Sequence, residues 1–411
     1  MFLPVDEQIR RIRAGAESIV PADELVAKLE RSAREARPLL IKQGFDPTRP
    51  DLHIGHAVSI HKLRTFQELG HRVVFVMGDF TARVGDPSGR DETRPVLSEE
   101  EIESNLATYE DQVFRILDPA ATEIRKNSEW LAGLALADIL RLTSQYTVAR
   151  MLERDDFAAR HREGRPISLV EFLYPMMQAY DSVALRADVE LGGTDQRFNL
   201  LLGRTLQERA GQEPQVCLIM PLLRGTDGRR KMSKSYDNYI GISMEAEEAF
   251  GRVMSIPDSL LDEWLVLASG ARPGELAERR AGAATDPLAT KRWLAERIVA
   301  RYQGAAAAGN AMEAFDRIHR RRQVPENLAT TALSLGEGEA MWIGHVLRDS
   351  GLAPSSSEAG RLIRQGAVRV DGGVVEDRDL RLGPGAYVVQ RGKRSFVRVL
   401  IQPGKLTPDG E

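Results

Sequence analysis

Apolar residues in the first half of the chain form short continuous runs separated by periodic segments. Leu39–Ile41 and Val73–Met77 are continuous runs, and between them apolar residues recur at mostly three-residue spacing from Ala57 to Leu69. Such spacing predicts a helix, and a continuous apolar run predicts a strand that is buried on both faces. The resulting βαβ pattern predicts a parallel sheet flanked by helices. Further strands are predicted at residues 123–125, 188–191 and 216–220.

The pattern changes along the rest of the chain. Residues 5–36 predict two charged amphipathic helices broken by a proline, and residues 244–322 are wholly helical in pattern. Residues 323–340 lack periodicity, and Asp371-Gly372 between two apolar segments predicts a hairpin. We therefore expect an α/β fold with a Rossmann-like parallel sheet over 1–243, an all-α domain over 244–322, a linker over 323–340 and a small α+β domain over 341–411.

Composition narrows the class of protein. The 411 residues are 42% hydrophobic and 28% charged, which is ordinary for a soluble globular chain. No apolar run reaches the length of a membrane span, and the first residues do not resemble a signal peptide. The single cysteine, Cys217, excludes an intramolecular disulfide and a cysteine-cluster zinc site. We expect a cytoplasmic protein with no membrane partner and no structural metal.

Charge is unevenly distributed. The whole chain has a net charge of −4, whereas residues 341–411 contain 11 Lys and Arg against 8 Asp and Glu, a net of +3. A basic excess confined to the C-terminal end is the direction expected if that end contacts nucleic-acid phosphate.

Two segments indicate phosphate chemistry. His53-Ile54-Gly55-His56 follows a glycine- and proline-containing turn and begins a helix, whose free N–H groups attract phosphate. Two histidines at a helix start are often ordinary surface residues, but the turn and helix favour a site. Lys231-Met232-Ser233-Lys234-Ser235 follows a glycine-flanked basic loop, and its ammonium groups suit a transferring phosphoryl group. A solvated loop is the alternative for a charge run, and the chain has no P-loop motif.

These segments resemble the HIGH and KMSKS signatures of class I aminoacyl-tRNA synthetases, and residues 35–400 resemble bacterial tyrosyl-tRNA synthetases most closely. The resemblance implies a tyrosine–tRNA ligase that uses ATP with Mg²⁺, binds L-tyrosine and its tRNA, and forms a homodimer. It implies catalytic roles for His53, His56, Lys231 and Lys234, and for Arg90 and Arg94 in the loop after Gly85. The implied ATP-binding residues are Gly44, Asp46, Thr48, Gly55, Gly192, Asp195, Met232 and Ser233.

Amino-acid specificity is expected on one helix. Tyr174, Gln178 and Asp181 are spaced i, i+4 and i+7 and therefore share one helical face, where a solvent-facing polar stripe is the alternative. The resemblance implies that Tyr174, Gln178 and Asp86 hold the tyrosine ammonium, and that Asp181 accepts from the phenolic hydroxyl. Gln196 follows Asp195 and is implied to contact the amino acid, while Asp195 itself could instead cap the next helix.

One residue departs from the family pattern. Lys42 stands where many bacterial members have a tyrosine that contacts the substrate hydroxyl. A lysine cannot make the same contact, and it could pair with a carboxylate or extend to solvent. The second contact to the phenol is therefore unassigned.

The C-terminal segment, residues 342–398, resembles the S-four RNA-binding module. Arg361 and Arg364 lie on a predicted short helix before the hairpin and are expected to contact tRNA. Ser356 and Gly360 replace the more usual arginines, which weakens phosphate contact but not the fold. A tryptophan-specific ligase and an RNA-binding scaffold without catalysis are the rival interpretations; Gln178 near Tyr174 and this module favour tyrosine, and the intact histidines and lysines favour catalysis.

Overall fold

The computed structural model describes residues 2–87, 98–319, 328–335, 339–392 and 395–403. It separates into two compact units, Met1–Ala308 and Gly309–Glu411. No helix among the described residues is both long and apolar enough to cross a membrane.

A six-stranded sheet forms the centre of the first unit, in the order β1-β6-β5-β2-β3-β4. All neighbours are parallel except β1 and β6, which pair antiparallel. The strands β2, β3, β5 and β6 are largely buried, because helices cover both faces of the sheet. The strands are β1 Ser18–Val20, β2 Leu40–Phe45, β3 Arg72–Met77, β4 Thr122–Lys126, β5 Val189–Gly193 and β6 Val216–Met220.

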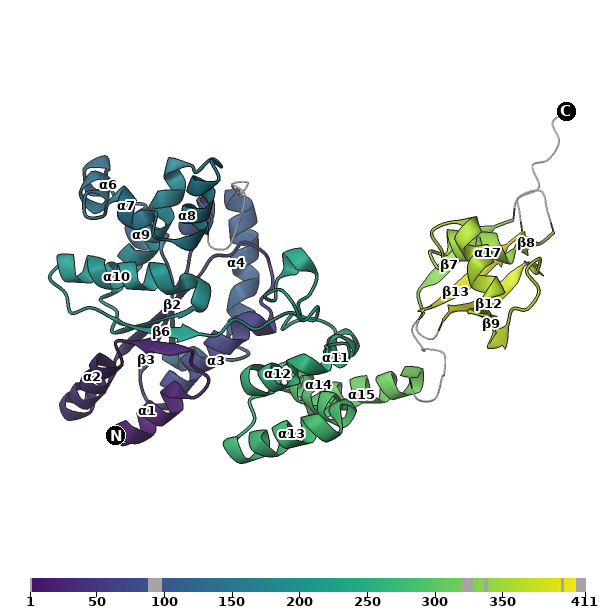
Figure 1. Ribbon diagram of the computed structural model, residues 1–411, viewed down its shortest axis with the longest axis horizontal. Helices are drawn as coiled ribbons and strands as arrows, with labels where there is room; N and C mark the ends of the chain where they lie inside the picture. Colours follow the sequence, from purple (N-terminus) through teal and green to yellow (C-terminus); the bar gives the residue numbers. More distant parts are fainter. Residues whose placement is uncertain (1, 88–97, 320–327, 336–338, 393–394, 404–411) are drawn as a thin grey trace. The chain divides into compact units, whose positions relative to one another are not determined.

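Figure 1 shows α9 and α10 on one face of this sheet and α3 on the other. The helices of the α/β part are α1 Val5–Arg13, α2 Ala22–Glu35, α3 Ile54–Glu68, α4 Glu99–Val113, α5 Ser128–Leu131, α6 Leu136–Thr143, α7 Val148–Met151, α8 Asp155–Arg162, α9 Leu169–Leu185 and α10 Arg197–Arg209. Short 3₁₀ turns lie at Thr81–Arg83, Pro119–Ala121, Thr194–Gln196, Lys234–Tyr236 and Asp258–Leu260.

The order of strands creates a switch point between β2 and β5. From β2 the chain runs through α3 to β3 and then β4, whereas β5 and β6 lie on the other side of β2. Loops after β2 and β5 therefore diverge at the carboxyl edge of the sheet, where ligands bind in open α/β folds. This edge positions the site described below.

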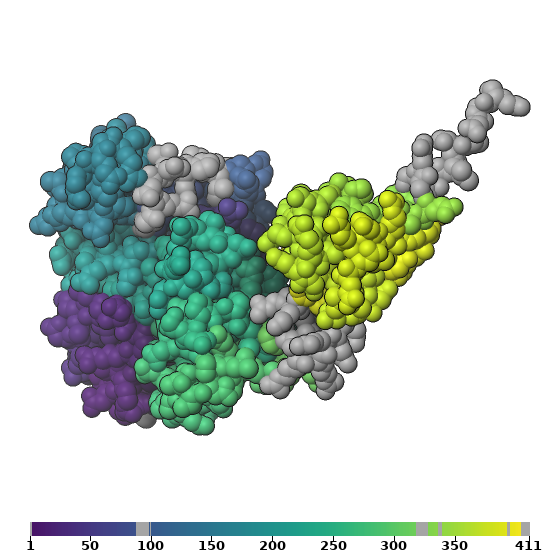
Figure 2. Space-filling model, turned by 45° about the vertical axis from the view of Figure 1, so that its right-hand side comes forward, coloured from purple at the N-terminus to yellow at the C-terminus, as the bar shows by residue number. Residues whose placement is uncertain are grey.

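The predicted helical segment follows the sheet and belongs to the same unit up to Ala308. Its helices are α11 Ala246–Met254, α12 Leu261–Ala268, α13 Pro273–Thr285, α14 Pro287–Gln303 and α15 Ala305–His319. Trp264 on α12 and Leu294 on α14 are fully buried, and α12 also packs against α3. In both views α6–α8 and α11–α14 lie at opposite ends of the first unit (Figure 1, Figure 2).

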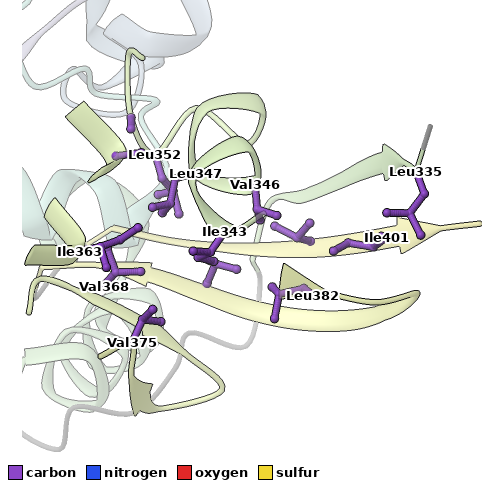
Figure 3. Packing of buried hydrophobic residues seen from close by; sticks show 14 residues of the cluster. Leu335, Ile343, Val346, Leu347, Leu352, Ile363, Val368, Val375, Leu382 and Ile401 are labelled. Atoms are coloured by element: carbon purple, nitrogen blue, oxygen red, sulfur yellow. The ribbon is translucent and has the colours of Figure 1, made fainter. Parts of the chain in front are cut away.

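The second unit is a small α+β fold. Its five-stranded sheet has the order β10-β9-β12-β13-β7, and β8 pairs with β11. Figure 3 shows apolar side chains such as Ile343, Val346 and Leu347 packed between α16 and the long strands. The elements are β7 Thr330–Ser334, β8 Met341–Trp342, α16 Ile343–Asp349, α17 Ser356–Arg364, β9 Val368–Val370, β10 Gly373–Val374, β11 Arg381–Leu382, β12 Gly385–Arg391 and β13 Ser395–Gln402.

These elements confirm the predicted fold class: a Rossmann-like parallel sheet, helices, and a C-terminal α+β module. The Asp371-Gly372 hairpin is also confirmed, and both residues have positive φ, 49° and 85°, as a type I′ turn requires.

Three local predictions differ from the structure. β1 lies between the two N-terminal helices, where only a helix break is predicted. Thr330–Ser334, inside the predicted linker, forms β7 and pairs with β13. β2 continues to Phe45, into the predicted turn, because its register with β3 extends to Met77. All three gain their backbone partners from distant segments, which local periodicity does not encode.

Candidate active site

The carboxyl edge of the sheet brings together residues from segments far apart in the sequence. His53 and His56 lie at the start of α3, just after β2, and the loop of residues 231–235 follows β6. His53 pairs with Gly241 as an antiparallel bridge, and the Ile54 N–H donates to the Ile240 carbonyl at 2.9 Å. The chain that follows the lysine loop therefore runs directly beside the histidine segment.

The two imidazoles stack at the beginning of α3. Their ring centroids are 3.8 Å apart, with an angle of 18° between the rings. Burial lowers the pKa of His56 to about 4, helped by Lys234 and Lys231, and holds the pKa of His53 well below its usual value. Both rings are thus neutral at pH 7. The His53 backbone N–H donates to His56 Nδ1 at 3.4 Å, which leaves the proton of that ring on Nε2.

Gly55 permits a close approach between the histidine segment and the lysine loop. A Cβ at this position would lie 2.9 Å from His53 Nδ1 and 3.4 Å from Met232 Cβ. Any larger residue would therefore separate the histidines from the loop that carries the lysines.

Each lysine of the loop is paired with a carboxylate. Lys231 Nζ lies 2.7 Å from Asp195 Oδ2, just after β5, and Lys234 Nζ lies 2.9 Å from Asp51 Oδ2, just before α3. Burial lowers the pKa of Lys234, an effect that Asp51 opposes. The two lysines thus place positive charge beside both the β5 loop and the turn before α3.

Asp46, at the end of β2, belongs to a hydrogen-bonded group. Tyr174 on α9 donates its hydroxyl to Asp46 Oδ2 at 2.8 Å, and Thr81 donates to Oδ1 at 2.8 Å. Burial and the nearby carboxylates hold the pKa of Tyr174 above its usual value, so that it remains a donor. A Cβ on Gly78 would overlap Asp46 Oδ1 and Thr81 Oγ1. Asp46 therefore connects the nucleotide segment with the predicted amino-acid helix.

Polar side chains from three elements surround Asp86. Gln196 donates to Asp86 Oδ2 at 2.7 Å, and Arg154 donates to Oδ1 at 3.3 Å. Asn199 donates to both Gln178 Oε1, at 2.8 Å, and Gln196 Oε1, at 2.9 Å. Asp86 and Gln178, two of the residues predicted to hold an ammonium group, are therefore joined through Gln196 and Asn199, whereas the third, Tyr174, bonds to Asp46.

Asp181 is 3% exposed and lies at the other end of the same face of α9. Trp130 Nε1 donates to Asp181 Oδ1 at 2.8 Å, and Asn127 Nδ2 donates to Oδ2 at 3.5 Å. Burial raises the pKa of Asp181 to about 7, against the lowering effects of Lys42 and of Trp130. The group is thus a buried carboxyl group whose pKa is raised towards neutral pH.

Sequence reasoning missed several residues of this site. Asn127 directly follows β4, so the rule that selects strand ends could have found it. No local signal identifies the others, because their position depends on helices that pack from elsewhere. These missed residues are Trp130, Arg154, Asn199 and Thr81.

Lys42, the departure from the family pattern, is buried rather than extended to solvent. Its Nζ lies 2.9 Å from Glu190 Oε1, and both side chains are 1% exposed. Of the two alternatives that the sequence leaves open, the structure shows pairing with a carboxylate.

The remaining predicted residues lie in different parts of the chain. Gly44 lies in β2 and Thr48 in the loop that follows it. Gly192 is the next-to-last residue of β5, and a Cβ there would meet Leu200 at 2.8 Å. Ser233 caps the short turn that begins at Lys234. Arg90 and Arg94 lie outside the described residues. Arg361 and Arg364 are exposed on α17 of the second unit. Among the residues described, no group of three or more His, Cys, Asp or Glu could hold a metal.

Comparisons with known proteins identify similar chains. A family model described as "tRNA synthetases class I (W and Y)" matches residues 34–320, and an S4 domain model matches residues 341–388. The tyrosine–tRNA ligase of Carboxydothermus hydrogenoformans is 48% identical over 410 residues, covering 97% of this chain and 100% of that protein. The tyrosine–tRNA ligase of Geobacter metallireducens is 50% identical over 404 residues, with coverage of 97% and 100%.

Solved structures show the same fold. The tyrosyl-tRNA synthetase of Archaeoglobus fulgidus, complexed with L-tyrosine, has a TM-score of 0.61 at 22% identity and covers 75% of this chain and 100% of that one.

Proposed function

The chain belongs to the family of class I tRNA synthetases for tryptophan and tyrosine, and from that premise we propose how its residues perform the reaction. Its activity is that of a tyrosine–tRNA ligase. It activates L-tyrosine with ATP to tyrosyl-adenylate and pyrophosphate, and it then transfers tyrosine to the 3′-terminal ribose of its tRNA. One observation supports the assignment most strongly: the histidine segment and the lysine loop meet, through the Lys234–Asp51 pair and the bridge from His53 to Gly241, beside a partly buried carboxylate network.

In the first step the tyrosine carboxylate attacks the α-phosphate of ATP in line, and pyrophosphate leaves. No side-chain nucleophile is needed, because positioning and electrostatic stabilisation lower the barrier. His53 and His56 are neutral N–H donors to the phosphates, and neutrality keeps them from binding the ground-state phosphates as fixed charges. Lys231 and Lys234 follow the charge onto pyrophosphate, together with Arg90 and Arg94 of the loop outside the described residues.

ATP binds where the β2 and β5 loops diverge. The start of α3 receives phosphate, and Gly55 allows the nucleotide to approach the backbone. Asp195 accepts from the ribose hydroxyls once Lys231 moves to the phosphates. Mg²⁺ carried by the ATP phosphates would neutralise part of their charge. The other residues proposed for the nucleotide are Gly44, Asp46, Thr48, Gly192, Met232 and Ser233.

Tyrosine binds along the α9 face. Asp86, Tyr174, Gln178 and Gln196 surround its ammonium group, and Asp181 accepts from its phenolic hydroxyl. Phenylalanine would leave Asp181 desolvated and without that donor, which costs about 1–3 kcal/mol or more. Trp130 and Asn127 orient the carboxylate for this role.

The tRNA contacts both units. Arg361 and Arg364 on α17 present positive charge to its backbone, as an exposed basic helix suits phosphate. We also propose a homodimer, supported by exposed apolar side chains on α6 and at the start of α9: Leu136 is 71% exposed and Leu169 is 82% exposed. A cytoplasmic location fits the substrates, ATP and tRNA.

The test is amino-acid-dependent exchange of labelled pyrophosphate into ATP, followed by single-turnover charging of tRNA. We expect exchange with tyrosine, and far less with tryptophan or phenylalanine. Exchange with tryptophan instead would favour the other specificity of this family. No exchange with any of the three, together with retained tRNA binding, would favour a non-catalytic RNA-binding scaffold.

A further inference from the structure

A buried ion pair spans the switch point of the sheet. Lys42 on β2 and Glu190 on β5 are aligned in the strand register, and Lys42 Nζ lies 2.9 Å from Glu190 Oε1. Both side chains are 1% exposed. Burying a lysine and a glutamate is costly, and such pairs are often no more stabilising than apolar residues of similar size. The pair therefore suggests a purpose other than stability.

The contacts of the pair lead to the helix that carries the predicted specificity residues. Lys42 Nζ donates to the backbone carbonyl of Gln178 at 3.4 Å, and Ser182 donates to Glu190 Oε2 at 3.1 Å. Gln215 also donates to Glu190 Oε2. Gln178 and Ser182 stand on either side of Asp181 in α9, so the pair is attached to the helix one turn before and one residue after that carboxyl group.

Several elements direct charge or hydrogen bonds at Asp181. Trp130 and Asn127 donate to its oxygens from the segment after β4. From the sheet, Lys42 contributes a positive charge and Glu190 a negative one. On α9 itself Asp181 acts electrostatically on Tyr174, whose pKa it helps to raise. Lys42 is the positive charge that opposes the burial of this carboxyl group.

We propose that Lys42 is a positioning residue for tyrosine recognition: anchored by Glu190, it places a fixed positive charge against α9 at the Gln178 carbonyl, one turn before Asp181, and so favours the carboxylate form that accepts from the phenol. The lysine itself does not contact the substrate hydroxyl. A charge against the helix that carries the acceptor thus replaces the hydroxyl contact that a tyrosine at position 42 would make. This inference rests on the proposed role of Asp181.

The consequence is a pH dependence of tyrosine binding. Burial raises the pKa of Asp181 to about 7, and Lys42 acts in the opposite direction. As pH falls through this value the carboxylate is lost, so the dissociation constant for tyrosine rises. Lys42→Met removes the opposing charge, so the same rise begins at a higher pH. A shift of one pKa unit corresponds to about a tenfold weaker binding of tyrosine in the affected range.

The experiment measures the dissociation constant of labelled tyrosine by equilibrium dialysis between pH 6 and 9. Lys42→Met is compared with Lys28→Met, a matched control that removes another buried lysine, paired with Asp188 and Glu213. We expect a shifted pH profile and about tenfold weaker tyrosine binding near pH 7 for Lys42→Met only. Binding of phenylalanine, which has no hydroxyl to donate, should not acquire this pH dependence.

Two further variants keep the proposal testable if Lys42→Met does not fold. Glu190→Gln removes the negative charge, so the rise in the dissociation constant for tyrosine should begin at a lower pH. In the double variant, Lys42→Met with Glu190→Gln, this rise should begin at a higher pH than in Glu190→Gln alone. These two variants differ at position 42 alone, and the double variant leaves neither member of the buried ion pair behind.

The outcomes separate the two levels of inference. Coincident pH profiles for Lys42→Met and the wild type, or for Glu190→Gln and the double variant, would overturn the role of Lys42 alone. Absence of tyrosine-dependent exchange in the wild type would instead refute the proposed function. A wild-type profile that is flat from pH 6 to 9 would show that Asp181 does not titrate in this range, and would overturn the proposed pH dependence of tyrosine binding.

Discussion

Lys234 Nζ lies 2.9 Å from Asp51 Oδ2, which ties the lysine loop to the turn before α3. The lysine is largely buried, and it also lies 5.8 Å from the centre of the Tyr239 ring. The catalytic charge is therefore held in place before ATP arrives and must exchange Asp51 for phosphate.

Replacing Asp51 by Asn should make this exchange easier. Asp51 is 45% exposed, so the pair contributes only up to about 1 kcal/mol. We expect the KM for ATP in pyrophosphate exchange to fall by up to about fivefold, with kcat little changed. A loss of rate of more than tenfold would mean that Asp51 acts directly on the nucleotide.

Lys234→Ala should slow adenylate formation by about 10²–10³-fold, because it removes charge aimed at the transferring phosphoryl group. The dissociation constant for tyrosine should remain unchanged, since the α9 pocket does not include this residue. Rapid-quench measurement of adenylate and equilibrium dialysis of tyrosine separate the two effects. The control is Lys291→Ala, which removes a lysine of α14 that pairs with Asp258. Equal losses in both quantities would refute the assigned role.

Arg252 on α11 anchors the turn that follows the lysine loop. It donates to the Tyr239 carbonyl at 3.0 Å and to the Asp237 carbonyl at 3.2 Å, and Asp237 has a positive φ of 48°. Arg252→Met should lower the rate of adenylate formation about tenfold. Hydrogen bonds from a charged group contribute about 1.5–3 kcal/mol, and without them the lysine loop is less well positioned. Single-turnover kinetics provide the measurement.

The matched control for Arg252→Met is Arg280→Met, which removes an exposed arginine of α13 that pairs with Asp262 on α12. It should react at the wild-type rate. If Arg252→Met also reacts at that rate, the loop does not depend on the helical segment.

Gly78→Ala should disturb the Asp46 network. The added methyl group would overlap Asp46 Oδ1 and Thr81 Oγ1, and overpacking of this kind costs about 1–3 kcal/mol. We expect a lower Tm by thermal unfolding and weaker tyrosine binding, because Tyr174 loses its partner. Gly133→Ala is the control, since nothing lies within 4 Å of its added Cβ. Equal Tm values for the two variants would contradict the close packing at Gly78.

Arg361→Ala with Arg364→Ala should raise the KM for tRNA in aminoacylation several-fold. Removal of two phosphate contacts should also reduce the dependence of tRNA binding on salt, by about one unit of slope per contact. Pyrophosphate exchange without tRNA should be unaffected, which serves as the internal control. An unchanged salt dependence would place the tRNA elsewhere on the protein.

The sequence was sufficient where the information is local. Continuous apolar runs specify β2 and β3, three-residue spacing specifies α3, and Asp371-Gly372 specifies its own turn. The rule that ligands bind at strand ends located the histidine segment and Asp195, because chain direction at a strand end follows from secondary structure alone.

The tertiary structure decided what depends on distant partners. β1 and β7 form because β6 and β13 supply their backbone partners, which the local pattern of the sequence does not show. The partners of Asp181 and of Lys42, Trp130 and Glu190, come from other strands and helices. Whether Lys42 pairs or extends to solvent depends on whether a carboxylate, here that of Glu190, lies next to it on the neighbouring strand. Only the strand register, set by packing of the whole unit, answers it.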